Sequence, residues 1–174
     1  MLQRLIARRR DRQAGDRLYA ACVAQARAPA LYREMGVPDR IDARFELYLL
    51  HVVLVMDRLE REGDRGEDVS RALLGRFVSQ LDDALREIGV GDLAVGKKMR
   101  KLGEAIHGRW RAYQAALAGE GDPLETVLSR NVLGEEQADA SALAAYAAAA
   151  RDRLAAQALD DLLRNGPNWP EVAR

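Results

Sequence analysis

The chain has 174 residues, of which 48% are apolar and 31% charged, a composition typical of a folded soluble protein. Lys and Arg total 27 and so do Asp and Glu, so the overall charge gives no affinity for DNA or membranes, and only local segregation of charge could do so. With Cys22 as its one cysteine and only two histidines, the chain cannot form an intramolecular disulfide or a zinc cluster. The length suits one domain, and the cysteine content fits a reducing compartment.

Residues 1–28 are Arg-rich and predict a basic amphipathic helix. Its apolar and basic side chains alternate at helical spacing: Leu2, Leu5 and Ile6 with Arg4, Arg8, Arg9, Arg10 and Arg12. The apolar run Leu18–Ala24 that follows loosely resembles a signal peptide. Asp11, Asp16 and Arg17 interrupt that pattern, so we expect a segment of the mature protein. Docking on anionic lipid and a merely solubilising terminus both stay open for this helix.

Helical periodicity dominates the whole chain and strand patterns are nearly absent, which predicts an all-α, single-domain bundle of about six helices. The first helix covers about Leu2–Arg27, with a break at Gly15 as one alternative. The others cover about Ala30–Met35, Asp39–Glu62, Glu67–Ile88, Asp92–Ala118 and Ala138–Asn165, with a short extra helix over Leu124–Asn131. Gly63–Gly66 and Gly119–Asp122 are expected as loops. We expect residues 29–174 to form one globular unit on which the N-terminal helix docks.

One corner sequence occurs twice. Gly36-Val37-Pro38-Asp39 parallels Gly89-Val90-Gly91-Asp92. Each predicts a helix that ends on a left-handed Gly, a Val that folds back, and an Asp that caps the next helix. Both corners should therefore be rigid.

The helix predicted over 39–62 is apolar on nearly all sides, which is typical of a central buried helix. Only Glu46 and His51 interrupt its segment Phe45–Met56, which is too short to span a bilayer. We expect His51 to be a satisfied structural histidine, because no second ligand at metal spacing accompanies it or His107. Cys22 is expected as a small core residue.

The helix predicted after Gly91 has two different faces. Its apolar side chains step by three and four along the chain: Met99, Leu102, Ile106, Trp110, Tyr113 and Leu117. The other face carries basic side chains with only Glu104 to offset them: Lys97, Arg100, Lys101 and Arg111. A solvated outer face explains this pattern, and so does a cationic docking surface for an acidic protein segment, lipid headgroups or RNA.

Catalytic motifs are missing from the sequence. It contains no phosphate-binding Gly loop, no nucleophile elbow and no paired His and carboxylate. We therefore expect no enzyme activity and no cofactor.

Several segments together resemble the ubiquinol–cytochrome c chaperone family. They are Ala43-Arg44-Phe45 with Leu49-Leu50-His51, the long ordered segment Leu85–Met99, Gly108-Arg109 with Tyr113, and Arg130-Asn131-Val132. The resemblance covers about Pro29–Leu133. The family pattern has an aromatic residue before Gly108, where this chain has His107.

The resemblance implies a non-enzymatic assembly factor, here a bacterial relative, that binds cytochrome b during biogenesis of the ubiquinol–cytochrome c oxidoreductase. Mitochondrial members work beside the ribosome with a small partner protein. The implied protein is a cytoplasmic monomer without a DNA partner, peripheral at the inner face of the inner membrane, where ribosomes or anionic lipid are further partners. A binding module at the membrane or ribosome without a cytochrome client is the alternative, and a haem carrier using His51 and His107 is a third.

The resemblance and the charge pattern together indicate a client-binding surface. We expect Arg86, Asp92, Lys97, Lys98 and Lys101 to border it. Arg44 and His51 would support the surface from beneath, and Arg109 is a further partner-binding residue.

Overall fold

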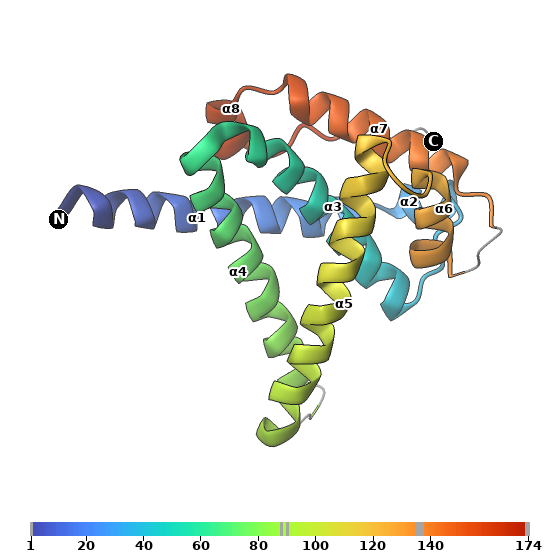
Figure 1. Cartoon of the computed structure of the whole chain (residues 1–174), viewed down its shortest axis with the longest axis horizontal. Coiled ribbons are helices and arrows are strands. Elements are labelled where there is room, and N and C mark those ends of the chain that lie inside the picture. The colour runs from blue at the N-terminus through green and yellow to red at the C-terminus, as the bar shows by residue number, and fades with distance from the viewer. Residues whose placement is uncertain (1, 88, 90, 135–137, 173–174) are drawn as a thin grey trace.

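The protein is an all-helical bundle, as a computed structural model of the chain shows (Figure 1). The structure describes residues 2–87, 89, 91–134 and 138–172, with their side chains except those of 2–5 and 92–94. The helices are α1 (Leu2–Ala26), α2 (Pro29–Arg33), α3 (Ile41–Leu59), α4 (Gly63–Glu87), α5 (Asp92–Ala118), α6 (Leu124–Leu128), α7 (Ser141–Ala156) and α8 (Leu159–Asn165). A 3₁₀ turn, η1 (Glu60–Glu62), follows α3, and a π-helical turn, η2 (Ser129–Leu133), follows α6. The predicted fold class is confirmed.

α3 is the central helix of the bundle. α1, α4, α5, α7 and η2 all pack against it. From Leu47 to Met56 every side chain except the half-buried Tyr48 is buried. This confirms the core helix predicted from its apolar composition.

α1 is one unbroken helix that packs on α3 and α4. Gly15 is buried where α1 meets α4, and a Cβ at this position would lie 2.8 Å from atoms of Ala72. Gly15 therefore permits close packing of the two helices, and the alternative of a break there is wrong. The first half of α1 projects clear of the bundle (Figure 1).

The loop predicted over Gly63–Gly66 is wrong, because these residues form the first turn of α4. The chain reverses direction at Gly63 itself, which has a φ of 57° after the turn η1. A Cβ on Gly66 would overlap the backbone carbonyl oxygen of Leu59. The two glycines thus make one tight corner between α3 and α4.

The single helix predicted over Ala138–Asn165 is also wrong, because α7 and α8 are separate helices. Gln157 interrupts the helical backbone between them, because its ψ of 129° is extended. Its side-chain amide donates to the carbonyl oxygen of Gly166 at 2.9 Å and accepts from the backbone N–H of Asn168 at 3.0 Å. Contacts with the C-terminal tail therefore accompany the break and stabilise it.

The two Gly–Val corners are confirmed in part. Gly36 and Gly89 have φ values of 67° and 83°, as predicted for left-handed helix ends, and Val37 is buried. Val90 lies outside the described residues. The predicted Asp caps are wrong, since α3 follows Arg40 and α5 follows Gly91, neither with a side-chain cap hydrogen bond.

Candidate functional site

α4 and α5 form a long hairpin whose tip projects away from the bundle (Figure 1). Near the bundle, α4 buries Val69, Leu73 and Phe77. Toward the tip the same stripe continues with Leu81 and Leu85, which are only half-buried. We refer to residues 78–87, 89 and 91–105 of this hairpin as the arm. Its apolar stripe is less well covered than that of the bundle, because the tip lies beyond the other helices.

Four of the predicted site residues are exposed cations of the arm. Lys97, Lys98 and Lys101 lie on α5, and Arg86 lies on α4, where its Nε is 2.7 Å from Oδ2 of Asp82. Within the described part of the chain, none of the three lysines has a carboxylate within ion-pair distance. The side chain of Asp92 lies outside what the structure describes. These three lysines thus present their charges to solvent without an ion pair among the described side chains.

A groove of about 480 Å³ opens where the arm joins the bundle. Three helices line it, through Met56 of α3, Leu74 and Val78 of α4, and Gly103, Ile106, His107, Trp110, Arg111 and Gln114 of α5. Val78 is 38% exposed, and no atom lies within 4 Å of the position of a Cβ on Gly103. The floor is therefore apolar and accessible, while His107, Arg111 and Gln114 supply polar groups. Sequence analysis missed this groove because its walls come from three separate segments.

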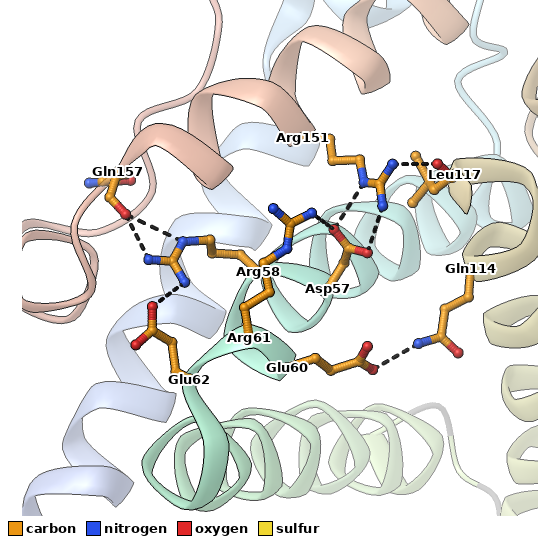
Figure 2. A network of polar contacts seen from close by, with 9 residues as sticks. All are labelled: Asp57, Arg58, Glu60, Arg61, Glu62, Gln114, Leu117, Arg151 and Gln157. Carbon is orange, nitrogen blue, oxygen red and sulfur yellow. Dashed lines mark hydrogen bonds and ion pairs between the residues drawn. The ribbon is translucent and has the colours of Figure 1, made fainter. Parts of the chain in front are cut away.

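A polar network joins the base of α5 to the bundle (Figure 2). Arg151 of α7 donates to Asp57 of α3 through both Nε and Nη2, at 3.0 and 3.2 Å. The same guanidinium donates to the carbonyl oxygen of Leu117 near the end of α5. Gln114 adds a hydrogen bond of 2.8 Å to Oε1 of Glu60. The bundle end of α5 is therefore tied to α7 and to the turn η1.

Figure 2 also shows a second group of polar contacts, at the corner between α3 and α4. Arg58 is buried, and its Nη1 lies 2.6 Å from Oε1 of Glu62. Its Nη2 donates to the backbone carbonyl of Gln157 at 2.8 Å. Because Gln157 follows the last turn of α7, the guanidinium also lies at the negative end of that helix dipole. Arg58 thus fixes the corner at which α4 begins.

Arg109, a predicted partner-binding residue, lies half-buried on α5 and forms an ion pair with Glu46 of α3. Glu46 is only 2% exposed, and burial raises its pKa to about 7 even though the charge of Arg109 acts to lower it. The buried Tyr113 hydroxyl lies beside Glu46 and Asn131 of η2, and burial raises the pKa of this phenol. Arg109 therefore joins α5 to the core. Glu46 was visible in the sequence only as a carboxylate inside an apolar run.

His51 lies in the core and not on the surface. Its Nδ1–H donates to the carbonyl oxygen of Leu47 at 2.7 Å, because a carbonyl can only accept. Its Nε2 then accepts from the Tyr146 hydroxyl at 2.8 Å, and the Tyr146 oxygen accepts from Gln25 at 2.9 Å. Burial lowers the pKa of His51 to about 4, so the ring is neutral near pH 7. The predicted structural histidine is confirmed, as is the burial of Cys22.

Arg44 lies apart from the arm. It is exposed near the start of α3, where its Nε donates to Oδ1 of Asp39 at 2.6 Å. The partners of His51 lie on α3, α7 and the C-terminal tail, where the Trp169 ring packs edge-on at 5.0 Å. The described contacts of Arg44 and His51 therefore do not include the α4 or α5 part of the predicted surface.

Two classes of site find no support in the described residues. No group of three or more His, Cys, Asp or Glu side chains lies together there as a metal site would require. None of the helices that the structure describes has the length and apolar character needed to cross a membrane.

The family model for the ubiquinol-cytochrome C chaperone matches residues 33–169, which include the arm, the groove and the Arg109 cluster. The chain belongs to this family. The match confirms the resemblance seen in the sequence and extends it toward the C-terminus. A solved structure supports it: the chain superposes on the Cbp3 homolog from Brucella abortus with a TM-score of 0.84 and 30% identity, covering 99% of this chain and 98% of the other.

Curated relatives are more distant in sequence. The chain is 22% identical over 120 residues to ubiquinol-cytochrome-c reductase complex assembly factor 1 of Xenopus laevis, covering 69% of this chain and 60% of the relative. It is 22% identical over 123 residues to the factor of the same name from Mus musculus, covering 71% and 42%. The chain therefore corresponds to about half the length of these relatives.

Proposed function

We propose that this chain is a non-enzymatic assembly factor of the ubiquinol–cytochrome c reductase complex and that it holds the cytochrome b subunit during biogenesis. The family match over residues 33–169 carries this proposal, since the curated relatives in the same family are assembly factors of that complex by name. The near-complete superposition on the Brucella abortus protein shows that the similarity extends over the whole bundle.

The groove at the base of the arm is the proposed site for the client. Its apolar floor, with Val78, Ile106 and Trp110, suits the apolar face of a helical segment, which binds to such grooves through residues spaced by three and four. Arg111 lines the same groove, and Lys97 and Lys101 lie further along α5. These cations would attract acidic side chains that flank the apolar segment.

The membrane character of the proposed client also suggests where the chain acts. A membrane subunit is met at the bilayer surface as it emerges, so we place the chain in the cytoplasm at the inner face of the inner membrane. In that position the groove would cover an apolar segment that has not yet found its partners.

Charge reversal on the arm tests the proposal. In the variant with Lys97, Lys98 and Lys101 changed to Glu, crosslinking to cytochrome b should fall at least several-fold, because the attraction becomes repulsion. A control variant reverses Arg33, which is exposed on α2. It should crosslink like the parent chain. Unchanged crosslinking in the arm variant, with helical content and unfolding midpoint intact, would overturn the assignment of this surface.

Deletion separates the proposal from its alternative, a membrane- or ribosome-associated module without a cytochrome client. Loss of the assembled cytochrome c reductase complex alone, with other membrane complexes at normal levels, supports the chaperone. A general loss of membrane proteins supports the alternative and contradicts the specific client.

A further inference from the structure

The first half of α1 is a basic rod that projects from the bundle (Figure 1). Contact with the bundle is closest from Ala14 and Gly15 onward, which are buried. In segment 6–13 only Asp11 is half-buried, and all other side chains, including Arg8, Arg9, Arg10 and Arg12, are exposed. The segment 6–13 therefore presents a surface that the bundle covers on one side at most.

The positive charge of this segment is not neutralised within the described structure. Arg8, Arg9, Arg10 and Arg12 face one acidic neighbour in sequence, Asp11. None of the four has a carboxylate within ion-pair distance among the described side chains. Arginines of the neighbouring helices do have such partners: Arg65 lies 3.0 Å from Asp160, and Arg71 lies 2.7 Å from Asp68. Four guanidinium groups without an ion pair among the described side chains thus lie within five consecutive residues of α1.

Two hollows lie beside α1, and one of them extends the basic surface. Arg8 and Arg12 line this hollow of about 620 Å³ together with Arg71 of α4. The other hollow, of about 690 Å³, has balanced charges, since it is lined by Arg10, Arg17, Arg65 and Arg164 and by Asp11, Asp64, Asp68 and Asp160. Asp11 and Asp68 border both hollows. Groups the size of a phosphate can enter either one.

The chemistry of the projection favours lipid over nucleic acid. The first aromatic residue of the chain is Tyr19, so residues 1–18 provide no ring on which bases could stack. Ile6 is 46% exposed one turn or less before Arg8, Arg9 and Arg10. An exposed apolar side chain among arginines is what a helix needs to lie at the boundary between headgroups and acyl chains.

We propose that the projecting half of α1 docks the chain on an anionic phospholipid surface. The guanidinium groups of Arg8, Arg9, Arg10 and Arg12 bind lipid phosphates, to which arginine can donate two parallel hydrogen bonds. The long arginine side chains reach the headgroups from more than one side of the helix, and Ile6 enters the acyl boundary. This docking needs no client and is independent of the groove.

Each arginine near an anionic surface strengthens binding by about five-fold. Changing all four to Gln should therefore weaken binding by roughly two to three orders of magnitude at low salt. High salt should weaken the parent chain strongly as well, because the attraction is screened.

Vesicle flotation of the full chain tests the proposal, with vesicles of phosphatidylcholine alone or mixed with phosphatidylglycerol. The parent chain should float with the anionic vesicles only, and the variant with Arg8, Arg9, Arg10 and Arg12 changed to Gln should stay at the bottom. The matched control changes Arg33, Arg130 and Arg153, which are exposed outside the projection and the arm, to Gln and should float like the parent. Circular dichroism checks that α1 stays helical.

Two results would overturn the proposal. One is a parent chain that does not bind anionic vesicles, or a quadruple variant that binds them equally well. The other is preferential binding of single-stranded RNA at the same salt, lost in the same variant, which would assign the projection to nucleic acid.

Crosslinking to cytochrome b in these variants reports the proposed function separately. A quadruple variant that loses vesicle binding and keeps client crosslinking leaves both proposals standing, whereas loss of crosslinking in the arm variant alone affects neither lipid result.

Discussion

The centre of α3 and the arm differ in the burial and the partners of their polar side chains. In α3, Glu46, His51 and Arg58 are buried, and each lies against a partner that offsets its removal from water. On the arm, Lys97, Lys98 and Lys101 are exposed without ion pairs among the described residues. The contrast indicates that the bundle fixes the base of the hairpin, while the arm lysines remain accessible to solvent.

The largest expected effect concerns packing. Leu50→Ala should lower the free energy of unfolding by about 3 kcal/mol, because the side chain is fully buried in the centre of the core. The matched change Leu81→Ala on the half-buried arm stripe should cost about 1 kcal/mol or less. Urea unfolding measures both. Equal losses would show that the arm is packed as tightly as the core and would break the comparison.

The next effect is acid sensitivity. The folded chain holds the pKa of His51 at about 4, below the ordinary value of 6.5, so between these pH values His51 carries a proton in the unfolded state and not in the folded state. Stability from neutral His51 should be fully present above pH 6.5 and should fall by up to about 3 kcal/mol as the pH drops to 4. Glu46, whose pKa burial raises to about 7, acts in the opposite direction over this range, so urea unfolding is measured in chains that carry Glu46→Gln.

The variant His51→Asn is the control for that slope. It should be less stable near neutral pH, because it loses the hydrogen bonds to Leu47 and Tyr146. It should also lose most of the acid dependence between pH 6.5 and 4. The same slope in both proteins would mean that another group causes the acid sensitivity.

A smaller effect tests Arg109. Arg109→Met should cost about 2 kcal/mol, because it leaves the Glu46 carboxylate buried without its cation, although the partial exposure of Arg109 weakens the pair. Adding Glu46→Gln should restore part of this loss, since a neutral amide is cheaper to bury. Thermal unfolding of the single and double variants measures the rescue. If Arg109→Met keeps its stability and loses client crosslinking, Arg109 belongs to the binding surface and not to the core.

Local patterns in the sequence predicted those features that depend on neighbours within a few residues. The burial of α3 follows from its apolar composition, and the positive φ of Gly36 and Gly89 follows from the Gly–Val corners. The exposure of Lys97 and Lys101 follows from the two faces of α5.

Features decided by distant contacts could not be predicted. Gly15 looked like a helix breaker, but its role is set by Ala72, which packs against it from another helix. The break at Gln157 occurs in an Ala-rich sequence of high helix propensity and depends on contacts with Gly166 and the tail. The pair between Glu46 and Arg109 and the groove at the base of the arm likewise require segments that the sequence does not bring together.

The smallest expected effect is on the arm lysines. Changing Lys97, Lys98 and Lys101 to Gln should alter the free energy of unfolding by less than about 0.5 kcal/mol, because exposed charges without partners contribute little to stability. Urea unfolding at low and high salt measures the change. A loss above about 1 kcal/mol would mean that these lysines stabilise the fold, and the contrast between core and arm would weaken.

Photo-crosslinking from the groove tests the central claim most directly. A photoreactive amino acid at Val78, which is exposed in the groove, is compared with one at Ala149, which is exposed on α7. In crosslinked membranes the chain with the probe at 78 should capture cytochrome b, and the chain with the probe at 149 should not. Equal capture from both positions, or capture from 149 alone, while the cytochrome c reductase complex still assembles, would contradict the assignment of the groove as the client site.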